Sequence, residues 1–385
     1  MSLIKVALDA SRVRSGGGIA HLIGILSIAD PTEFGIAEIH VWSHSRLLAL
    51  LPDHKWLVKH HHVALERSLV HQVWWQMMQL SRAVKLASCQ ILFSADASTF
   101  CRFKPMIVLN QNMLAYDEGV LSLFGWSRVR VQQTLMYVVQ RSAFRFAEGS
   151  IFLTNHAAKQ VQRRVGRLQK TACIAHGVAD IFKQTSTRRI WPTSGERAIR
   201  CLYVSPVFEY KHQAEVVQAV KLLRDQGVNL SLTLVGGGGQ RALNLLDKLL
   251  AEVDPGSSFV QLLDFLPNDE VAGLIAEADL YIFASSCETF GIALLEAMAV
   301  GLPIACSNRS SLPETLRDGG EYFDPQDPLS IVRAIDRLVT DPDRRDQLAF
   351  RAKELAQQYS WARSAQETWT FVVQTYHGMP AKAAV

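Results

Sequence analysis

The sequence predicts an α/β protein built from two Rossmann-like domains, each a doubly wound parallel sheet. Three observations lead to this prediction. The chain has 385 residues, which is too long for one ordinary core at roughly 150 residues per domain. In both halves, short apolar or β-branched runs alternate with amphipathic stretches of helical length, a pattern typical of parallel sheets covered by helices. A polar stretch containing Pro192 and Gly195 separates the halves and has the composition of a linker.

About six strands are expected in each half, each followed by a helix, as in a doubly wound domain. The first half offers strands at 4–9, 39–42, 91–94, 106–109, 150–154 and 172–175. The second half offers strands at 200–204, 231–235, 259–263, 280–283, 303–306 and 321–323. We expect an N-terminal domain over 1–183, a linker over 184–198 and a C-terminal domain over 199–358. A terminal helix over 359–385 is expected to pack back on the N-terminal domain.

Composition favours a globular protein with a buried core. Hydrophobic residues make up 49% of the chain and charged residues 20%. No apolar run approaches the roughly 18 uncharged residues of a membrane span, and no leader precedes the first strand, so we expect a cytoplasmic location, with peripheral binding to the inner face of the membrane as an extension. The six cysteines form no C-x-x-C pair, which argues against a zinc site or a disulfide framework.

Charge is shared unevenly between the halves. Residues 1–190 hold 23 Lys and Arg against 11 Asp and Glu, a net +12, whereas residues 191–385 hold 17 against 25, a net −8. Two stretches of the basic half, 69–85 and 119–145, mix aromatic residues with Arg and Lys. Such mixtures suit an anionic membrane surface, and an ordinary solvated or core-facing helix is the alternative. We expect no nucleic-acid partner.

Residues 280–303, LYIFASSCETFGIALLEAMAVGLP, carry the most informative pattern. A buried strand runs into a turn of small residues, after which a helix continues to a stop at Gly301 and Pro303. The free N–H groups at the start of such a helix suit a diphosphate. Glu288 should lie in the turn and Glu296 on the helix. Judged on spacing alone, an equally open alternative is that Glu288 caps the helix and Glu296 is a surface carboxylate.

This segment resembles the signature of glycosyltransferase family four, the retaining GT-B enzymes also called glycosyl transferases group 1. The resemblance implies that Glu288 holds a hydroxyl of the donor sugar and acts as a catalytic residue, and that Glu296 binds the ribose hydroxyls of the nucleotide. It also places the residues around them in the donor site: Thr289, Phe290, Gly291 and Ile292.

Residues 202–220, LYVSPVFEYKHQAEVVQAV, resemble the first strand and phosphate loop of that family. Ser205 stands where a glycine is common, and Lys211 stands at the diphosphate-binding lysine, which makes it the second catalytic candidate. A lysine ammonium beside two phosphates neutralises leaving-group charge without a metal. The sequence departs from the family at Pro206, where many members carry an arginine that also binds the diphosphate.

The glycine run that starts at Gly236 resembles the turn beside the nucleotide base, and Leu266 is expected near the same base. A plain flexible turn is the alternative. Gly17 and Gly18 match a glycine-rich loop that faces the cleft in the family.

Gln111 and Asn112 stand where many members have a histidine, and an amide cannot transfer a proton at neutral pH. His176 is expected to be structural. The triple His60-His61-His62 reads as an exposed sheet edge, not a metal site, because neighbouring residues on a strand point to opposite faces.

The resemblance therefore implies two domains facing across a cleft, with the donor on the C-terminal domain and the acceptor on the N-terminal one. The expected reaction is retaining transfer of a mannosyl, glucosyl, galactosyl or rhamnosyl unit from a nucleotide diphosphate sugar. The acceptor would be a polysaccharide or a lipid-linked oligosaccharide, and neither a metal nor another cofactor is expected. The alternative is a catalytically silent subunit that binds a nucleotide sugar or a lipid for a glycan assembly complex.

Overall fold

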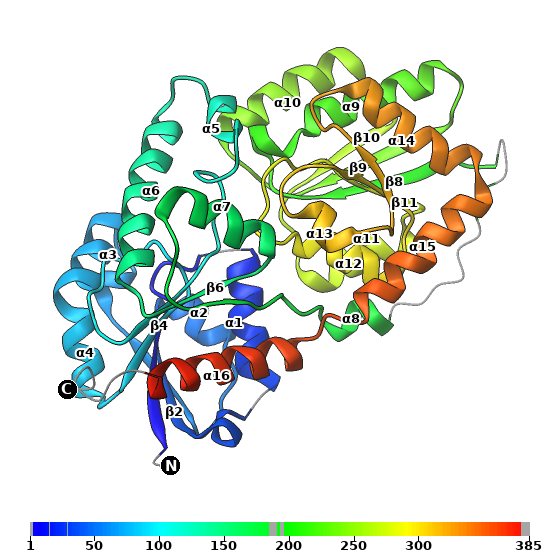
Figure 1. Ribbon diagram of the computed structural model, residues 1–385. Coiled ribbons are helices and arrows are strands. Elements are labelled where there is room, and N and C mark those ends of the chain that lie inside the picture. Colours follow the sequence, from blue (N-terminus) through cyan, green and yellow to red (C-terminus); the bar gives the residue numbers. More distant parts are fainter. Residues whose placement is uncertain (1–2, 15, 29, 185–190, 193–195, 379–385) are drawn as a thin grey trace. The chain divides into compact units, whose positions relative to one another are not determined.

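The computed structural model describes residues 3–14, 16–28, 30–184, 191–192 and 196–378, and the chain divides into two compact units (Figure 1). Unit 1 contains Met1–Leu121, Gly125–Gly177 and Ser360–Val385, and unit 2 contains Ser122–Phe124 and Val178–Tyr359. Most of the expected linker, namely 185–190 and 193–195, lies outside the described residues.

Unit 1 is built on a seven-stranded parallel sheet with the order β3-β2-β1-β4-β5-β6-β7. Its strands are β1 (Ile4–Asp9), β2 (Ile36–Ser43), β3 (Leu57–His61), β4 (Ile91–Ser94), β5 (Met106–Leu109), β6 (Gly149–Phe152) and β7 (Thr171–Cys173). The six expected strands are all present, and β3 is added at one edge. Every residue of β4 and β5 is buried, as expected for central strands covered on both faces.

The helices of the first half connect these strands. They are α1 (Gly17–Ile28), α2 (Ser45–Leu50), α3 (Leu69–Trp75), α4 (Ser81–Leu86), α5 (Val120–Leu123), α6 (Arg128–Phe146) and α7 (Asn155–Val165). A π-helical turn over Gln76–Leu80 joins α3 to α4, so that 69–86 is one continuous helical stretch.

The edge strand β3 changes the interpretation of the histidine triple. His60 is not exposed: its ring stacks on Trp42 of β2 with centroids 4.6 Å apart and lies 2.9 Å from a ring nitrogen of His40. Only His61 and His62 are exposed. Among the described residues, no group of three or more His, Cys, Asp and Glu side chains is arranged to hold a metal ion.

Helix α16 (Trp361–His377) completes unit 1 by packing on α1. Ser360 caps it by accepting a hydrogen bond from the N–H of Arg363. Two glycines make room for its first residue: a Cβ on Gly24 would lie 2.2 Å from the Trp361 ring, and a Cβ on Gly177 would lie 2.1 Å from the Trp361 backbone nitrogen.

Two buried histidines lie beside the same tryptophan. The Nδ1 atoms of His21 and His176 are 3.2 Å apart, and both rings contact Trp361. Burial lowers the pKa of His21 to about 4, and burial together with His21 lowers the pKa of His176 well below its ordinary value. Both rings are therefore neutral core residues near pH 7, in agreement with the structural role expected for His176.

Unit 2 is built on a six-stranded parallel sheet with the order β10-β9-β8-β11-β12-β13. Its strands are β8 (Ile199–Val204), β9 (Leu230–Val235), β10 (Val260–Leu263), β11 (Leu280–Phe283), β12 (Ile304–Ser307) and β13 (Glu321–Phe323). Its helices are α8 (Asp180–Gln184), α9 (Gln213–Asp225), α10 (Gln240–Val253), α11 (Asn268–Glu277), α12 (Ile292–Val300), α13 (Leu312–Leu316), α14 (Pro328–Thr340) and α15 (Pro342–Ala356). From β8 successive strands are added toward one edge of the sheet, and from β11 they are added toward the other edge. Parallel sheets of this kind bind ligands at this switch point between β8 and β11.

The contact between Gly177 and α16 predicts an asymmetric response to the same substitution at two glycines. Gly177→Ala should lower the free energy of unfolding by about 2 kcal/mol or more, because the new methyl group meets backbone atoms that cannot turn away. Gly273→Ala is the matched control: Gly273 lies inside α11 with open space around it, so alanine should stabilise the protein by about 0.5–1 kcal/mol. Urea unfolding of both variants checks the prediction, and equal midpoints would contradict it.

Candidate functional site

The predicted donor-site residues of unit 2 follow the carboxyl ends of β8, β9 and β11. Strand β8 pairs with both β9 and β11, and all the strands are parallel, so these ends lie at one edge of the sheet. Ser205 comes directly after β8, Gly236 after β9, and Glu288 five residues after β11.

Lys211 and Glu288, 77 residues apart in sequence, are in direct contact. The Lys211 Nζ donates a hydrogen bond to the Glu288 Oε1 and forms an ion pair with it. The two side chains are only 9% and 15% exposed. The Nζ also lies 5.2 Å from the ring centroid of Tyr210 and 5.8 Å from that of Phe283. The structure therefore brings the two predicted catalytic residues together in a place with little access to water.

The backbone that carries Lys211 is held by its neighbours. The Tyr203 hydroxyl donates to the Lys211 carbonyl at 2.6 Å, and the Lys211 N–H donates to the Phe208 carbonyl at 2.9 Å. The loop is tied to the turn after β11, because the Ser286 N–H donates to the Tyr210 carbonyl at 2.8 Å. Lys211 thus projects from a fixed point at the end of a short 3-10 turn, Glu209–Lys211.

The backbone of Glu288 is fixed by two serines from the loop after β12. The Ser310 Oγ accepts from the Glu288 N–H at 3.0 Å and lies 2.9 Å from the Glu288 carbonyl, to which the Ser311 Oγ also donates at 3.0 Å. Sequence reasoning missed both serines, and the left-handed φ of 58° at Ser310 has no signal in the residue type.

Helix α12 begins at Ile292, and its N-cap is Gly291, with φ 89°. A glycine cap has no side chain to accept from the first N–H groups of the helix, so those groups can face a ligand. The alternative in which Glu288 caps the helix is therefore wrong. Phe290 and Thr289 complete the turn, and the Phe290 carbonyl accepts from the Thr315 hydroxyl at 2.9 Å.

Glu296 lies one turn into α12 and is half-buried, so the alternative of an exposed surface carboxylate is wrong as well. Withdrawal from water raises the pKa of Glu296 to about 8. The pKa of the buried Tyr281 is raised first by burial and then by the charges of Glu296 and Glu288.

The glycine run after β9 packs closely against two neighbouring loops. A Cβ on Gly236, whose φ is 132°, would lie 2.6 Å from the Ser205 carbonyl oxygen, and one on Gly237 would lie 2.6 Å from the Asp264 carboxylate. The run is thus fitted between the loop after β8 and the loop after β10, which contains the half-buried Leu266. Close approach, not flexibility, explains the glycines.

Of the predicted residues in unit 1, the structure brings Gly18 close to Gln111 but engages the Asn112 side chain elsewhere. Gly17 and Gly18 open α1, and a Cβ on Gly18 would lie 2.8 Å from the Gln111 Oε1. Asn112 has its side chain engaged within its own loop and with α6: its Oδ1 accepts from the Leu114 N–H at 2.9 Å and its Nδ2 donates to the Gln133 Oε1 at 3.3 Å.

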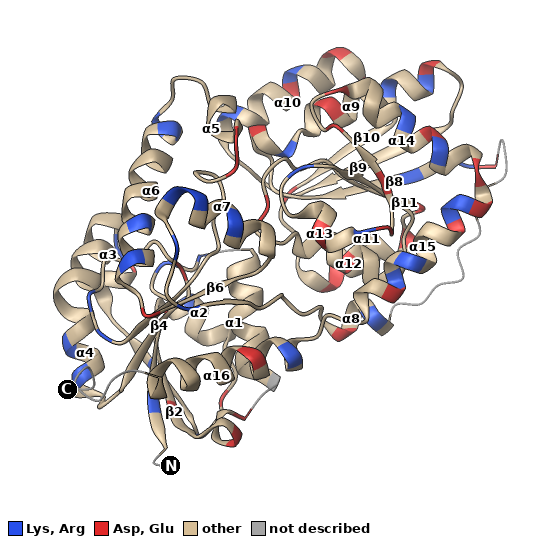
Figure 2. Ribbon diagram, in the orientation of Figure 1, with Lys and Arg blue, Asp and Glu red and all other residues tan. Residues whose placement is uncertain are grey.

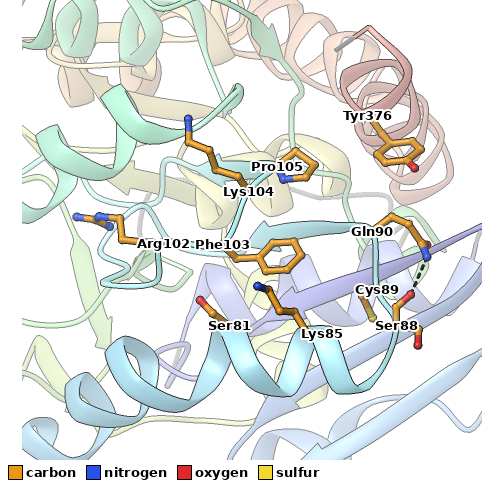
Figure 3. A pocket seen from close by; sticks show the side chains of 10 residues that line it. All are labelled: Ser81, Lys85, Ser88, Cys89, Gln90, Arg102, Phe103, Lys104, Pro105 and Tyr376. Carbon is orange, nitrogen blue, oxygen red and sulfur yellow. Dashed lines mark hydrogen bonds between the residues drawn. The ribbon is translucent and has the colours of Figure 1, made fainter. Parts of the chain in front are cut away.

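A pocket of about 530 Å³ lies elsewhere in unit 1, and no predicted site residue lines it (Figure 3). Gln90 and Pro105 line it just before β4 and β5 begin, so it opens at the amino ends of these strands. Ligands of open parallel sheets bind at the opposite, carboxyl ends. The pocket is therefore separate from the candidate site, and its basic lining residues are Lys85, Arg102 and Lys104.

The raised pKa of Glu296 predicts a pH-dependent gain of stability in Glu296→Gln. A carboxyl whose pKa is about 8 in the folded state and about 4.5 when unfolded makes the protein less stable as pH rises between these values. Glutamine removes this loss, so the variant should match the wild type near pH 4.5 and exceed it by up to about 4 kcal/mol at pH 8. Unfolding by urea at four pH values measures the difference; a gap that is constant with pH would contradict the assignment.

Comparisons with known proteins give a family match, curated relatives and structural neighbours. The family model described as glycosyl transferases group 1 matches residues 186–355. O-antigen chain mannosyltransferase B of Escherichia coli is 31% identical over 170 residues, which are 43% of this chain and 44% of that protein. The matched parts span only 33–57% of the first curated relatives.

Solved structures share the whole two-unit architecture. Sucrose-phosphate synthase from Thermosynechococcus elongatus superposes with a TM-score of 0.76 at 16% identity, covering 98% of this chain and 100% of that one. HepE of Anabaena, solved with UDP-glucose, superposes with a TM-score of 0.70 at 18% identity, covering 98% and 100%. These likenesses confirm the predicted fold class, two doubly wound parallel-sheet domains of the GT-B type. The family match covers residues 186–355, the part of the chain that holds Lys211, Glu288 and Glu296, and the chain resembles the glycosyl transferases group 1 family there.

Proposed function

We propose that the protein is a retaining glycosyltransferase that moves a hexosyl unit from a nucleotide diphosphate sugar to a glycan acceptor, without a metal or other cofactor. The observation that carries the proposal is the contact between Lys211 and Glu288 in front of an uncapped helix start, within a segment that matches the family model. A cation and free N–H groups suit the diphosphate, and the carboxylate suits a sugar hydroxyl.

Each residue has a defined part in this proposal. Lys211 neutralises the charge that develops on the leaving diphosphate, where low access to water strengthens the effect. Glu288 accepts a hydrogen bond from the donor sugar, and Glu296, farther along α12, accepts from the ribose hydroxyls. Ser205, Gly236 and Leu266 line the side of the nucleotide, and Thr289, Phe290, Gly291 and Ile292 shape the turn around the diphosphate.

In the proposed transfer step, the departing diphosphate acts as the base that accepts the proton of the acceptor hydroxyl. The bond between the anomeric carbon and the diphosphate oxygen breaks, a bond from that carbon to the acceptor oxygen forms on the same face, and the acceptor proton passes to the departing diphosphate. Asn112 and Gln111 carry no titratable group, so neither can be the base. Gly17 and Gly18 are proposed to give the acceptor close access to backbone.

The donor and acceptor classes are proposals drawn from relatives. One is named as an O-antigen chain mannosyltransferase, and a structural neighbour was solved with UDP-glucose. We therefore propose a mannosyl or glucosyl donor ahead of galactosyl or rhamnosyl ones, and a polysaccharide or lipid-linked oligosaccharide as acceptor. The second candidate, a silent nucleotide-sugar-binding subunit, is supported by the absence of the diphosphate-binding arginine at Pro206.

A nucleotide panel tests the donor site. UDP, GDP, ADP and dTDP are added separately at about 100 times their dissociation constants, where a true ligand should add about 2.7 kcal/mol of stability. Lys211→Ala should lose most of this gain and should lower turnover by roughly 100-fold, because one preorganised charge contact commonly contributes about 3 kcal/mol to a transition state. Thermal unfolding with each nucleotide, together with hydrolysis of the matching donor sugar, is the measurement. Stabilisation without any hydrolysis or transfer would favour the silent subunit, and no stabilisation by any nucleotide would refute the donor site.

We further propose that unit 1 binds an anionic membrane surface, at the inner face of the cytoplasmic membrane. Residues 67–95 and 119–147 contain no Asp or Glu, and Figure 2 shows basic and no acidic residues along α6. On α6 an exposed apolar stripe of Val131, Leu135 and Val138 is flanked by arginines, and Met78 is exposed on the stretch from α3 to α4. Among the described residues, no helix is long and apolar enough to span a bilayer.

Sedimentation with vesicles containing phosphatidylglycerol tests this surface. Binding should be strong at low salt and weak in neutral vesicles, because exposed charges are screened within about 10 Å at 0.1 M salt. The double variant Met78→Ser, Leu135→Ser should bind at least about a hundredfold less, since each buried apolar side chain contributes about 1.5–3 kcal/mol and each 1.4 kcal/mol is tenfold. Phe350→Ser is the control, because Phe350 is also an exposed apolar residue but lies on α15 of unit 2. Equal binding to neutral vesicles, or an equal loss in the control, would refute the surface.

A further inference from the structure

The ion pair between Lys211 and Glu288 has a second consequence for the proposed donor site. The lysine that should hold the diphosphate is bonded to a carboxylate in the structure. Both side chains are mostly buried, so water does little to weaken the pair. Any diphosphate that reaches Lys211 must therefore displace Glu288 or lie beside its negative charge.

The exchange requires only side-chain movement. The Glu288 backbone is held by Ser310 and Ser311, and the Lys211 backbone is held by Tyr203 and Phe208. Neither loop has to unfold or shift for the carboxylate to turn away from the ammonium group. The free energy of the exchange thus depends on the new partners that the ligand offers to Lys211 and to Glu288.

The two possible ligands differ in what they offer the displaced carboxylate. A nucleotide diphosphate sugar supplies phosphate oxygens to Lys211 and sugar hydroxyls to Glu288, so both charges gain new partners. A nucleoside diphosphate, the product of transfer, supplies only the phosphates and leaves the carboxylate beside added negative charge, which is costly in a site with little water.

We infer that Glu288 makes the site discriminate between its donor and its nucleoside diphosphate product, by holding Lys211 until a ligand arrives that can bind both residues. This inference rests on the proposed donor site. Glu288 acts here as a specificity-determining residue, in addition to its contact with the sugar, and it limits inhibition by the spent nucleotide.

Calorimetric titration of the full chain with UDP, GDP, UDP-glucose and GDP-mannose tests the inference. In Glu288→Gln, the nucleoside diphosphate that binds the wild type should bind about tenfold more tightly, because Lys211 is free and the repulsion is gone. The corresponding sugar nucleotide should gain less or bind more weakly, because it loses a charge-assisted hydrogen bond. The ratio of the two affinities should therefore shift toward the product.

Two controls isolate the pair. Glu209→Gln removes a carboxylate two residues from Lys211 whose oxygen lies 3.9 Å from Arg241, and it should change both affinities by less than about twofold. In a Lys211→Ala background, Glu288→Gln should keep only the part of its gain that comes from removing the negative charge, because no ammonium remains to be freed. Glu288→Ala repeats the test should the glutamine variant not fold.

The outcomes separate the two proposals. If nucleotides bind the wild type and are lost in Lys211→Ala, but Glu288→Gln binds the diphosphate no more tightly, the donor site stands and the discrimination is overturned. An equal gain in diphosphate affinity in Glu209→Gln would overturn the discrimination too, since the loss of any nearby negative charge would then explain the result. If none of the four nucleotides binds any variant, the donor site itself fails and this inference fails with it.

Discussion

Parallel pairing of β8 with β11 is the constraint on which the candidate site depends. Lys211 follows one strand and Glu288 the other, and only this pairing brings together two residues that are 77 positions apart. The loops then add their own ties, through Ser286 to the Tyr210 carbonyl on one side and through Ser310 to Glu288 on the other. A sheet edge thus positions two opposite charges in a site that excludes most water, where their interaction is stronger than on a surface.

Much of the fold could be predicted because its signals are local. Each expected strand is present, since buried parallel strands are short apolar runs between helical stretches, and α12 ends at Gly301 as its residues indicate. Strand β3 was expected only as an exposed sheet edge at the histidine triple and not as one of the six strands, because its half-exposed residues alternate weakly. The sequence did not indicate that His60 stacks on Trp42 of the neighbouring strand β2. That contact is set by tertiary structure and has no local signal.

The residues of the candidate site could be predicted from the sequence, but the contacts between them could not. The sequence pattern singles out Glu288, Glu296 and Lys211, yet it contains nothing to show that Glu288 and Lys211 bond to each other, or that burial raises the pKa of Glu296 to about 8. The serines that fix Glu288 were missed because a hydroxyl that bonds a distant backbone group resembles any loop serine.

The return of α16 to unit 1 has a consequence for the order in which the protein can be assembled on the ribosome. Unit 1 takes its last helix from residues 361–377, after the 182 residues from 178 to 359 that belong to unit 2. While those residues are being translated, Gly24 and Gly177 face no Trp361, and the side of the sheet that Trp369 will cover stays exposed to water. The second unit can therefore complete its core before the first, although it is translated later, and the nascent first unit is the part of the chain most open to chaperones.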